Sequence, residues 1–150
     1  MRCGSRRWPR YRNWKKSGFS AGMMWRIFRC GKIGYIENLE KGLALDKELI
    51  YGAALLHDIG RGLEYTQNIP HDQGSQLLAE KILPDCGYTK EEENAILEAI
   101  SGHRTADTGT RADLAGLLYR ADKKSRTCLF CSAQAECKWS TEKKNLTIEV

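Results

Sequence analysis

At 150 residues, the sequence is long enough to bury one hydrophobic core and too short for two, so it predicts a single globular domain. No run approaches the roughly 18 consecutive apolar residues that a membrane span requires, and no secretory signal pattern opens the chain, so we expect a cytoplasmic protein with no membrane partner. The net charge of +5 is unevenly distributed: of the 24 Lys and Arg, nine lie in residues 1–30, which hold no acid, and the remaining 15 accompany all 19 Asp and Glu.

The first two expected helices follow from apolar residues at three- and four-residue spacing. An apolar stripe predicts a helix over residues 31–42, where a glycine is a plausible C-cap. Asp46 is a good N-cap for a second helix, and Gly60 stands where that helix should stop. His57 and Asp58 are therefore expected at the C-terminal end of the second helix.

Two further helices are expected after a loop over residues 61–70. The third runs from about His71 to Leu83 and is closed by a proline and a glycine. Thr89 and Glu92 have the spacing of a capping box and predict the start of a fourth helix, which extends to about residue 102.

A fifth helix is expected from about Asp113 to Asp122. No stretch alternates apolar and polar residues as a strand would, and no internal repeat is present in the sequence. The fold class that these patterns predict is all-α, a compact bundle of five to six helices.

Histidine is scarce in this chain, and its placement is informative. The three histidines, His57, His71 and His103, each fall at or near the end of an expected helix. A single histidine at such a place is more often structural than functional. Three together favour a shared site.

The segment AALLHDIGR, residues 53–61, resembles the HD superfamily and in particular its HDIG-type hydrolases. The resemblance covers about residues 31–145 and implies a metal-dependent phosphohydrolase with an HD-domain bundle. In such proteins the His-Asp pair and an Asp on the last core helix ligate one divalent ion, and two intervening histidines serve a second. The matching positions here are His57, Asp58, His71, His103 and Asp122.

The chemistry of these residues is consistent with that implication. Imidazole nitrogen and carboxylate oxygen suit Mn, Fe, Zn, Ni or Mg, so we expect one or two divalent ions, with Asp58 as the carboxylate that bridges two. Metal-activated water would then attack a phosphoester, and two ions would neutralise phosphoryl charge. The expected substrate is a nucleotide or another small phosphorylated molecule.

Basic residues lie beside the expected ligands in the sequence and could bind phosphate. They are Arg61, Arg104, Arg120, Lys123 and Lys124. A solvated basic helix face is the competing interpretation, above all for Lys123 and Lys124. Asp58, Arg61 and Lys123 are the residues for which we predict a catalytic role.

Residues 1–30 depart from the family pattern. Relatives carry a further metal-binding histidine about thirty residues before the His-Asp pair, and no histidine precedes His57 here. The expected position falls near residues 26–29. We interpret residues 1–30 as the product of out-of-frame translation, and a nucleic-acid-binding arm and a targeting peptide are the alternatives.

Unique codons sharpen the frame hypothesis. Met23, Met24 and Trp25 fix the bases ATG ATG TGG, which read Asp-Val one base earlier. Permitted codons then allow a His-Asp-Val-Ala-His peptide like the one that opens relatives. The lost ligand would be its second histidine, encoded across Arg26 and Ile27.

The C-terminal residues carry half of the six cysteines. Cys128, Cys131 and Cys137 resemble part of a zinc or iron–sulfur ligand set that needs a fourth ligand. We favour reduced cysteines that pack a C-terminal cap. The expected organisation is an HD core over residues 31–126 and a cysteine-containing extension over residues 127–150 packed on it.

A second function, from another class, remains open at this stage. Without the first histidine, the chain could be a catalytically impaired HD domain that binds a metal or nucleotide as a ligand. Nucleic-acid binding by the basic arm is a weaker alternative and predicts salt-sensitive affinity. The sequence does not predict an oligomeric state.

Overall fold

The computed structural model describes residues 21–147, and within them the chain is helical with no strand. The helices are α1 (Ala21–Lys41), α2 (Lys47–Leu56), α3 (Arg61–Gln67), α4 (His71–Cys86), α5 (Lys90–Gly102) and α6 (Leu114–Lys124). Three short 3-10 turns follow α5 and α6: η2 (Ala106–Thr110), η3 (Cys128–Phe130) and η4 (Thr141–Lys143). The predicted all-α fold class is confirmed. No helix among the described residues is long and apolar enough to cross a bilayer.

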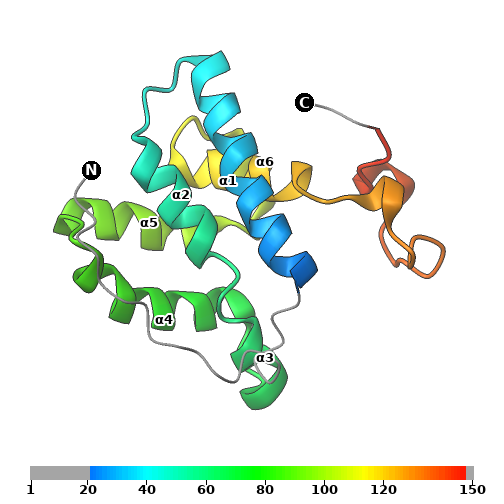
Figure 1. Cartoon of the computed structure of the whole chain (residues 1–150), viewed down its shortest axis with the longest axis horizontal. Coiled ribbons are helices and arrows are strands. Elements are labelled where there is room, and N and C mark those ends of the chain that lie inside the picture. Colours follow the sequence, from blue (N-terminus) through cyan, green and yellow to red (C-terminus); the bar gives the residue numbers. More distant parts are fainter. Residues whose placement is uncertain (1–20, 148–150) are drawn as a thin grey trace.

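The helices form one bundle around a continuous apolar core. Helix α1 packs against α2 and α6, α5 packs against α4, α2 and α6, and α3 packs against α4 (Figure 1). The core between them is built from small and aliphatic side chains, among them Ala53, Ile96, Ile100 and Leu117, which are fully buried. This packing brings the C-terminal ends of α2 and α5 next to the N-terminus of α4.

Local capping explains where several helices begin, and the sequence predicts two of these caps, Asp46 and Thr89. The Asp46 carboxylate accepts a hydrogen bond from the Glu48 N–H (2.6 Å), and the Asp113 carboxylate accepts one from the Gly116 N–H (3.0 Å). Thr89 forms the expected capping box with the residue three positions on. These contacts satisfy backbone donors that would otherwise lack partners.

The first helix begins ten residues earlier than the expected start at residue 31. Residues 21–30 contain no proline and continue the apolar face of α1, so Ile27 and Cys30 are buried with the rest of the core. The last ten residues of the basic segment 1–30 therefore belong to helix α1. The expectation for residues 1–20 lies outside the described residues.

Residues 61–70, expected as a loop, contain the short helix α3. It buries no residue completely and ends at Asn68, which adopts a left-handed conformation (φ 56°). Seven residues, none of them fully buried, give too weak a periodic signal to identify from sequence. Helix α4, expected to end at Leu83, continues through Pro84 to its left-handed cap at Gly87.

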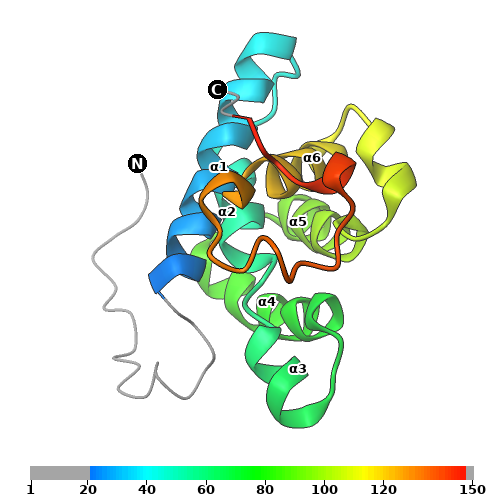
Figure 2. The same ribbon diagram turned by 90° about the vertical axis from the view of Figure 1, so that its right-hand side faces the viewer.

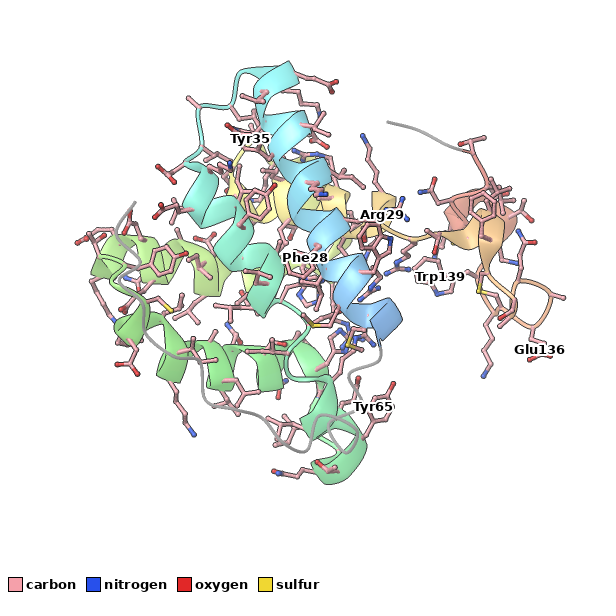
Figure 3. All side chains as sticks on the ribbon, in the orientation of Figure 1. Phe28, Arg29, Tyr35, Tyr65, Glu136 and Trp139 are labelled. Carbon is pink, nitrogen blue, oxygen red and sulfur yellow. The ribbon has the colours of Figure 1, made fainter. Side chains whose placement is uncertain are left out.

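The C-terminal residues leave α6 and lie to one side of the bundle (Figures 1 and 2). The Asn145 amide donates hydrogen bonds to the carbonyl oxygens of Lys124 (2.8 Å) and Arg126 (3.1 Å). The Arg126 guanidinium stacks 3.6 Å from the centre of the Trp139 ring. Figure 3 shows Trp139 on the bundle side of this extension and Arg29 on the side of α1 that faces it.

Candidate metal centre

His57 and Asp58 lie immediately after α2, and both are buried. His57 is the C-cap of α2, where its backbone N–H bonds the carbonyl of Ala53. Asp58 follows in the tight turn that leads into α3 at Arg61. The apolar face of α2 packs on the core, so its last turn carries the imidazole and the carboxylate into the protein interior.

Gly60 allows α4 to approach this turn closely. A Cβ atom on Gly60 would lie 2.2 Å from the Ser75 backbone nitrogen and 2.4 Å from the His71 carbonyl oxygen. The Gly60 N–H donates a hydrogen bond to the Ser75 hydroxyl (2.9 Å). Because this approach leaves no room for a side chain, the glycine of the HDIG string is what permits His71, at the start of α4, to reach Asp58.

The other two predicted ligands come from α5 and α6. His103 caps the C-terminal end of α5 and is buried. Asp122 lies in the last turn of α6 and is also buried. The rings of His57 and His103 meet edge to face at 5.4 Å between centroids, and those of His71 and His103 lie 5.6 Å apart.

Among the described residues, the side chains form two metal-sized donor sets that share Asp58. The inner donor set is His57, Asp58 and Asp122, and the outer donor set is Asp58, His71 and His103, with the ligand atoms of each set within 4.8 Å of one another. His57 Nε2 lies 3.6 Å from Asp58 Oδ2 and 3.5 Å from Asp122 Oδ1. His71 Nε2 lies 3.7 Å from Asp58 Oδ1.

Hydrogen bonds fix the same tautomer in all three histidines. The Nδ1–H groups of His57 and His103 donate to the carbonyl oxygens of Ala54 (2.7 Å) and Ile100 (2.5 Å). The Nδ1–H of His71 donates to the Glu64 carboxylate (3.1 Å). A carbonyl or carboxylate only accepts, so each Nδ1 carries a proton, and Nε2 is the nitrogen that would ligate a metal in the neutral ring, the arrangement typical of metal-ligating histidines.

Unpartnered buried atoms support this fit. His57 Nε2, Asp58 Oδ1 and Asp122 Oδ1 are buried and make no hydrogen bond to any described residue. Buried polar atoms without partners are uncommon and carry a large free-energy cost. Three such acceptor atoms in one cluster fit a cation, and their role as metal ligands stays a prediction.

Comparison with known proteins identifies the family. The family model for the HD domain matches residues 28–127. The chain belongs to the HD domain family. This is a family of metal-dependent phosphohydrolases whose members bind divalent metals, so the coarse class predicted from the HDIG segment is confirmed.

A relative from Clostridium beijerinckii, described as an uncharacterized protein, is similar over most of the HD domain. It is 42% identical over 117 residues, which cover 78% of this chain and 73% of the relative. No solved structure matches the chain.

The two basic residues predicted to act in catalysis lie against the carboxylates of the HD domain. Arg61 Nε is 3.0 Å from Asp58 Oδ2. Lys123 Nζ is 3.3 Å from Asp122 Oδ2 and 4.8 Å from the centre of the Tyr119 ring. Both side chains are thus ion-paired with carboxylates of the donor sets, and their catalytic role stays a prediction.

The other basic residues noted in the sequence have structural partners elsewhere. Arg120 Nε bonds Glu37 on α1 at 2.5 Å, and Lys124 Nζ lies 3.7 Å from the same carboxylate. Arg104 bonds Asp72 at 3.0 Å. Arg120 and Lys124 each lie two positions from Asp122 in the sequence, but both contact Glu37. Residues two positions apart on a helix point in different directions.

Three residues outside the predicted set of site residues contact the centre. Glu64 accepts the His71 hydrogen bond, and it was missed because α3 was expected as a loop. Arg126 lies four residues after Asp122, and its guanidinium is 3.4 Å from Asp122 Oδ2. This contact could have been predicted from the four-residue spacing, which brings side chains together on a helix. Arg26 of α1 donates to Asp58 and lies 3.6 Å from Asp122 Oδ1.

The charges around the centre shift its acid–base equilibria. Burial by itself would raise the pKa of the Asp122 carboxyl, but the neighbouring His57 imidazole and the Arg26 and Arg126 guanidinium groups outweigh it, so this pKa lies well below its ordinary value. Burial, followed by the neighbouring His57, lowers the pKa of His103 to about 4. A neutral His103 and an ionised Asp122 are the protonation states that bind a metal ion.

The C-terminal cysteines form no part of these donor sets. Cys128 is half-buried, Cys131 and Cys137 are exposed, and all three are free thiols. No group of three donors among the described residues includes a cysteine. Their assignment as reduced cysteines stays a prediction.

A groove with a volume of about 350 Å³ opens between the N-terminal half of α1 and the C-terminal extension. Its aromatic walls come from Trp25, Phe28 and Phe130, all of which are exposed. Arg126 lines the groove and also contacts Asp122, so it connects the groove to the inner donor set.

Proposed function

We propose that the chain hydrolyses a phosphoester bond in a small phosphorylated molecule with the help of a divalent metal ion. The observation that carries this proposal is the pair of adjoining donor sets, which present unpartnered acceptor atoms in a buried cluster next to Arg61 and Lys123. A cluster of neutral imidazoles and carboxylates suits Mn, Fe, Zn, Ni or Mg.

Different residues of the chain would bind the metal ion and the phosphoryl group. A bound divalent ion supplies a Lewis acid that polarises a phosphoryl oxygen and activates water. Asp58 belongs to both donor sets and would hold the ion, together with the Nε2 atoms that the Nδ1 hydrogen bonds leave free. Arg61 and Lys123 would neutralise the charge of the phosphoryl group, because both lie within 3.3 Å of a ligand carboxylate.

A nucleotide is the substrate class that the groove favours. Its volume of about 350 Å³ is within the range of small-molecule sites, and aromatic side chains offer a surface on which a base can stack. Arg126 joins this groove to Asp122, so a base held by Trp25 or Phe130 would direct its phosphate toward the donor sets.

The test begins with purified protein that has been stripped of metal and reloaded with Mn²⁺. Nucleoside monophosphates, p-nitrophenyl phosphate and bis-p-nitrophenyl phosphate are then assayed with and without the ion. We expect phosphate or nitrophenol release that depends on Mn²⁺ and falls at least about 100-fold in Asp58→Ala, because that variant removes a ligand common to both sets.

Asp85→Asn is the matched control, because Asp85 is an exposed carboxylate on α4. It should retain wild-type turnover. Turnover that persists in Asp58→Ala, or that is equal with and without Mn²⁺ after chelation, would rule out the proposed reaction. For the nucleotide preference, Trp25→Ala should raise KM for a nucleoside monophosphate several-fold and leave KM for p-nitrophenyl phosphate unchanged.

A second candidate function is a catalytically impaired HD domain that binds a metal or nucleotide without turnover. The favouring observation is that α1 contributes the guanidinium of Arg26 to the inner donor set in place of an imidazole. This candidate predicts nucleotide binding in a calorimeter at concentrations that give no product in any of the three assays.

A further inference from the structure

The N-terminal half of α1 carries a cation into the inner donor set. One Nη atom of Arg26 donates a hydrogen bond to Asp58 Oδ2, and the other lies 3.6 Å from Asp122 Oδ1. The Arg26 side chain is 23% exposed, whereas those of Asp58 and Asp122 are 1% and 5% exposed. The guanidinium is therefore inserted between the two carboxylates from the edge of the bundle.

The atoms that Arg26 contacts are the ones that an ion in the inner donor set would need. His57 Nε2 lies within 3.6 Å of Asp58 Oδ2 and Asp122 Oδ1, the same two oxygens that the guanidinium approaches. An arginine has no lone pair with which to ligate a metal and stays protonated in proteins. The guanidinium therefore lies where an ion of the inner donor set would bind, and it cannot act as a ligand to that ion.

Cationic side chains already outnumber the carboxylates around the inner donor set. Arg61 contacts the same Asp58 oxygen as Arg26, and Lys123 and Arg126 contact Asp122 Oδ2 at 3.3 and 3.4 Å. Four cationic groups therefore surround two carboxylates. A divalent ion entering among them would be repelled at short range by groups held in a partly buried, weakly screened environment.

Among the described residues, no cation is hydrogen-bonded to the carboxylate oxygen of the outer donor set. This oxygen, Asp58 Oδ1, has no hydrogen-bond partner and lies 3.7 Å from His71 Nε2. The Nδ1 hydrogen bonds of His71 and His103 leave their Nε2 atoms available. This set can accept an ion while Arg26 remains in place.

We infer that the chain binds a single divalent ion, in the outer donor set, and that Arg26 replaces the second ion by acting as a built-in counter-cation for Asp58 and Asp122. The inference rests on the proposed metal centre and specifies its occupancy. Arg26→His should convert the inner donor set into a second metal site, because an imidazole is shorter than an arginine side chain and leaves space for an ion while contributing a lone pair.

The experiment measures bound metal per chain by equilibrium dialysis against Mn²⁺ and elemental analysis. We expect about one ion per chain in the wild type, two in Arg26→His, and one in the matched control Lys81→His. Lys81 is an exposed cation on α4 that belongs to neither donor set and does not line the groove. A wild type that binds two ions or none, or an Arg26→His variant that binds only one, would overturn the inference.

Placement of the single ion provides a second readout that needs no change at Arg26. His71→Ala should abolish Mn²⁺ binding by the wild type, whereas His57→Ala should retain it, provided that circular dichroism shows each variant to be folded. The reverse pattern would contradict the inference. Binding of one ion in the outer donor set without hydrolysis would refute only the proposed function, and hydrolysis with two bound ions would refute only this inference.

Discussion

The backbone N–H of Gly60 donates a hydrogen bond of 2.9 Å to the hydroxyl of Ser75, and both residues are buried where the turn after α2 meets α4. This contact joins the element that carries His57 and Asp58 to the helix that begins at His71. The fold of the bundle and the geometry of the centre therefore depend on the same close approach.

Replacement of Gly60 tests that dependence. In Gly60→Ala the new Cβ would lie 2.2 Å from the backbone nitrogen of Ser75, which cannot rotate away, so α4 must shift. We expect a loss of about 3 kcal/mol in the free energy of unfolding, measured with urea, together with weaker Mn²⁺ binding. Gly102→Ala is the control, because its Cβ would meet side chains and no backbone atom, with Thr108 at 3.2 Å and Ala115 at 3.8 Å. The control should stay within about 1 kcal/mol of the wild type, and equal stability of the two variants would contradict the explanation.

Glu64 offers a test of how the histidine tautomers are set. Its carboxylate accepts the Nδ1–H of His71, which keeps Nε2 directed at Asp58. We expect Glu64→Gln to weaken Mn²⁺ binding by about tenfold in a calorimetric titration, with little change in thermal stability, because a neutral amide is a weaker acceptor. Glu80→Gln changes an exposed carboxylate on α4 and should have wild-type affinity. Unchanged affinity in Glu64→Gln would show that the contact does not tune the ligand.

The ion pairs of Glu37 are expected to make the stability of the fold depend on pH in the acidic range. Burial alone would raise the pKa of the Glu37 carboxyl, but hydrogen bonds from Arg120 (2.5 Å) and Lys41 (3.0 Å) outweigh it, so its pKa lies below the ordinary value. A lowered pKa means that this carboxylate stabilises the fold above about pH 4.3, its value in the unfolded chain, and that the contribution is lost as the pH falls toward the folded-state pKa.

Glu37→Gln should therefore cost about 3 kcal/mol at pH 7, since it leaves Arg120 without its buried partner between α6 and α1. The difference from the wild type should shrink as the pH falls below about 4. Unfolding curves recorded at several pH values measure both effects. Glu40→Gln, an exposed neighbour on α1, serves as the control and should show neither. A Glu37→Gln deficit that is constant with pH would exclude the carboxylate as its source.

The DNA that encodes residues 17–28 tests the proposed change of reading frame. Read one base earlier, it should encode a peptide with a histidine that spans the codons of Arg26 and Ile27. The location of Arg26 against Asp58 and Asp122 gives this prediction a structural counterpart, because a histidine there would belong to the inner donor set. An alternative frame without a histidine at that place would refute the hypothesis.

Local interactions made much of the fold predictable. The caps at Asp46, Thr89 and Asp113 each involve a backbone N–H two or three residues away, so the sequence alone contains both partners. The HDIG string likewise identified the family from contiguous residues. The short helix α3 was not predictable in this way, because nothing in its seven residues is fully buried.

The sequence by itself determined the helical class, the family and the residue types of the two donor sets. Only the tertiary structure decided which charges meet them. Arg26 reaches Asp58 across 32 residues, and Arg120 turns to Glu37 across 83, so each partner depends on how α1 packs on the rest of the bundle. Coulomb interactions depend on distance in space and not on spacing along the chain, so the position of Arg26 beside the two carboxylates is recognised only in the folded chain.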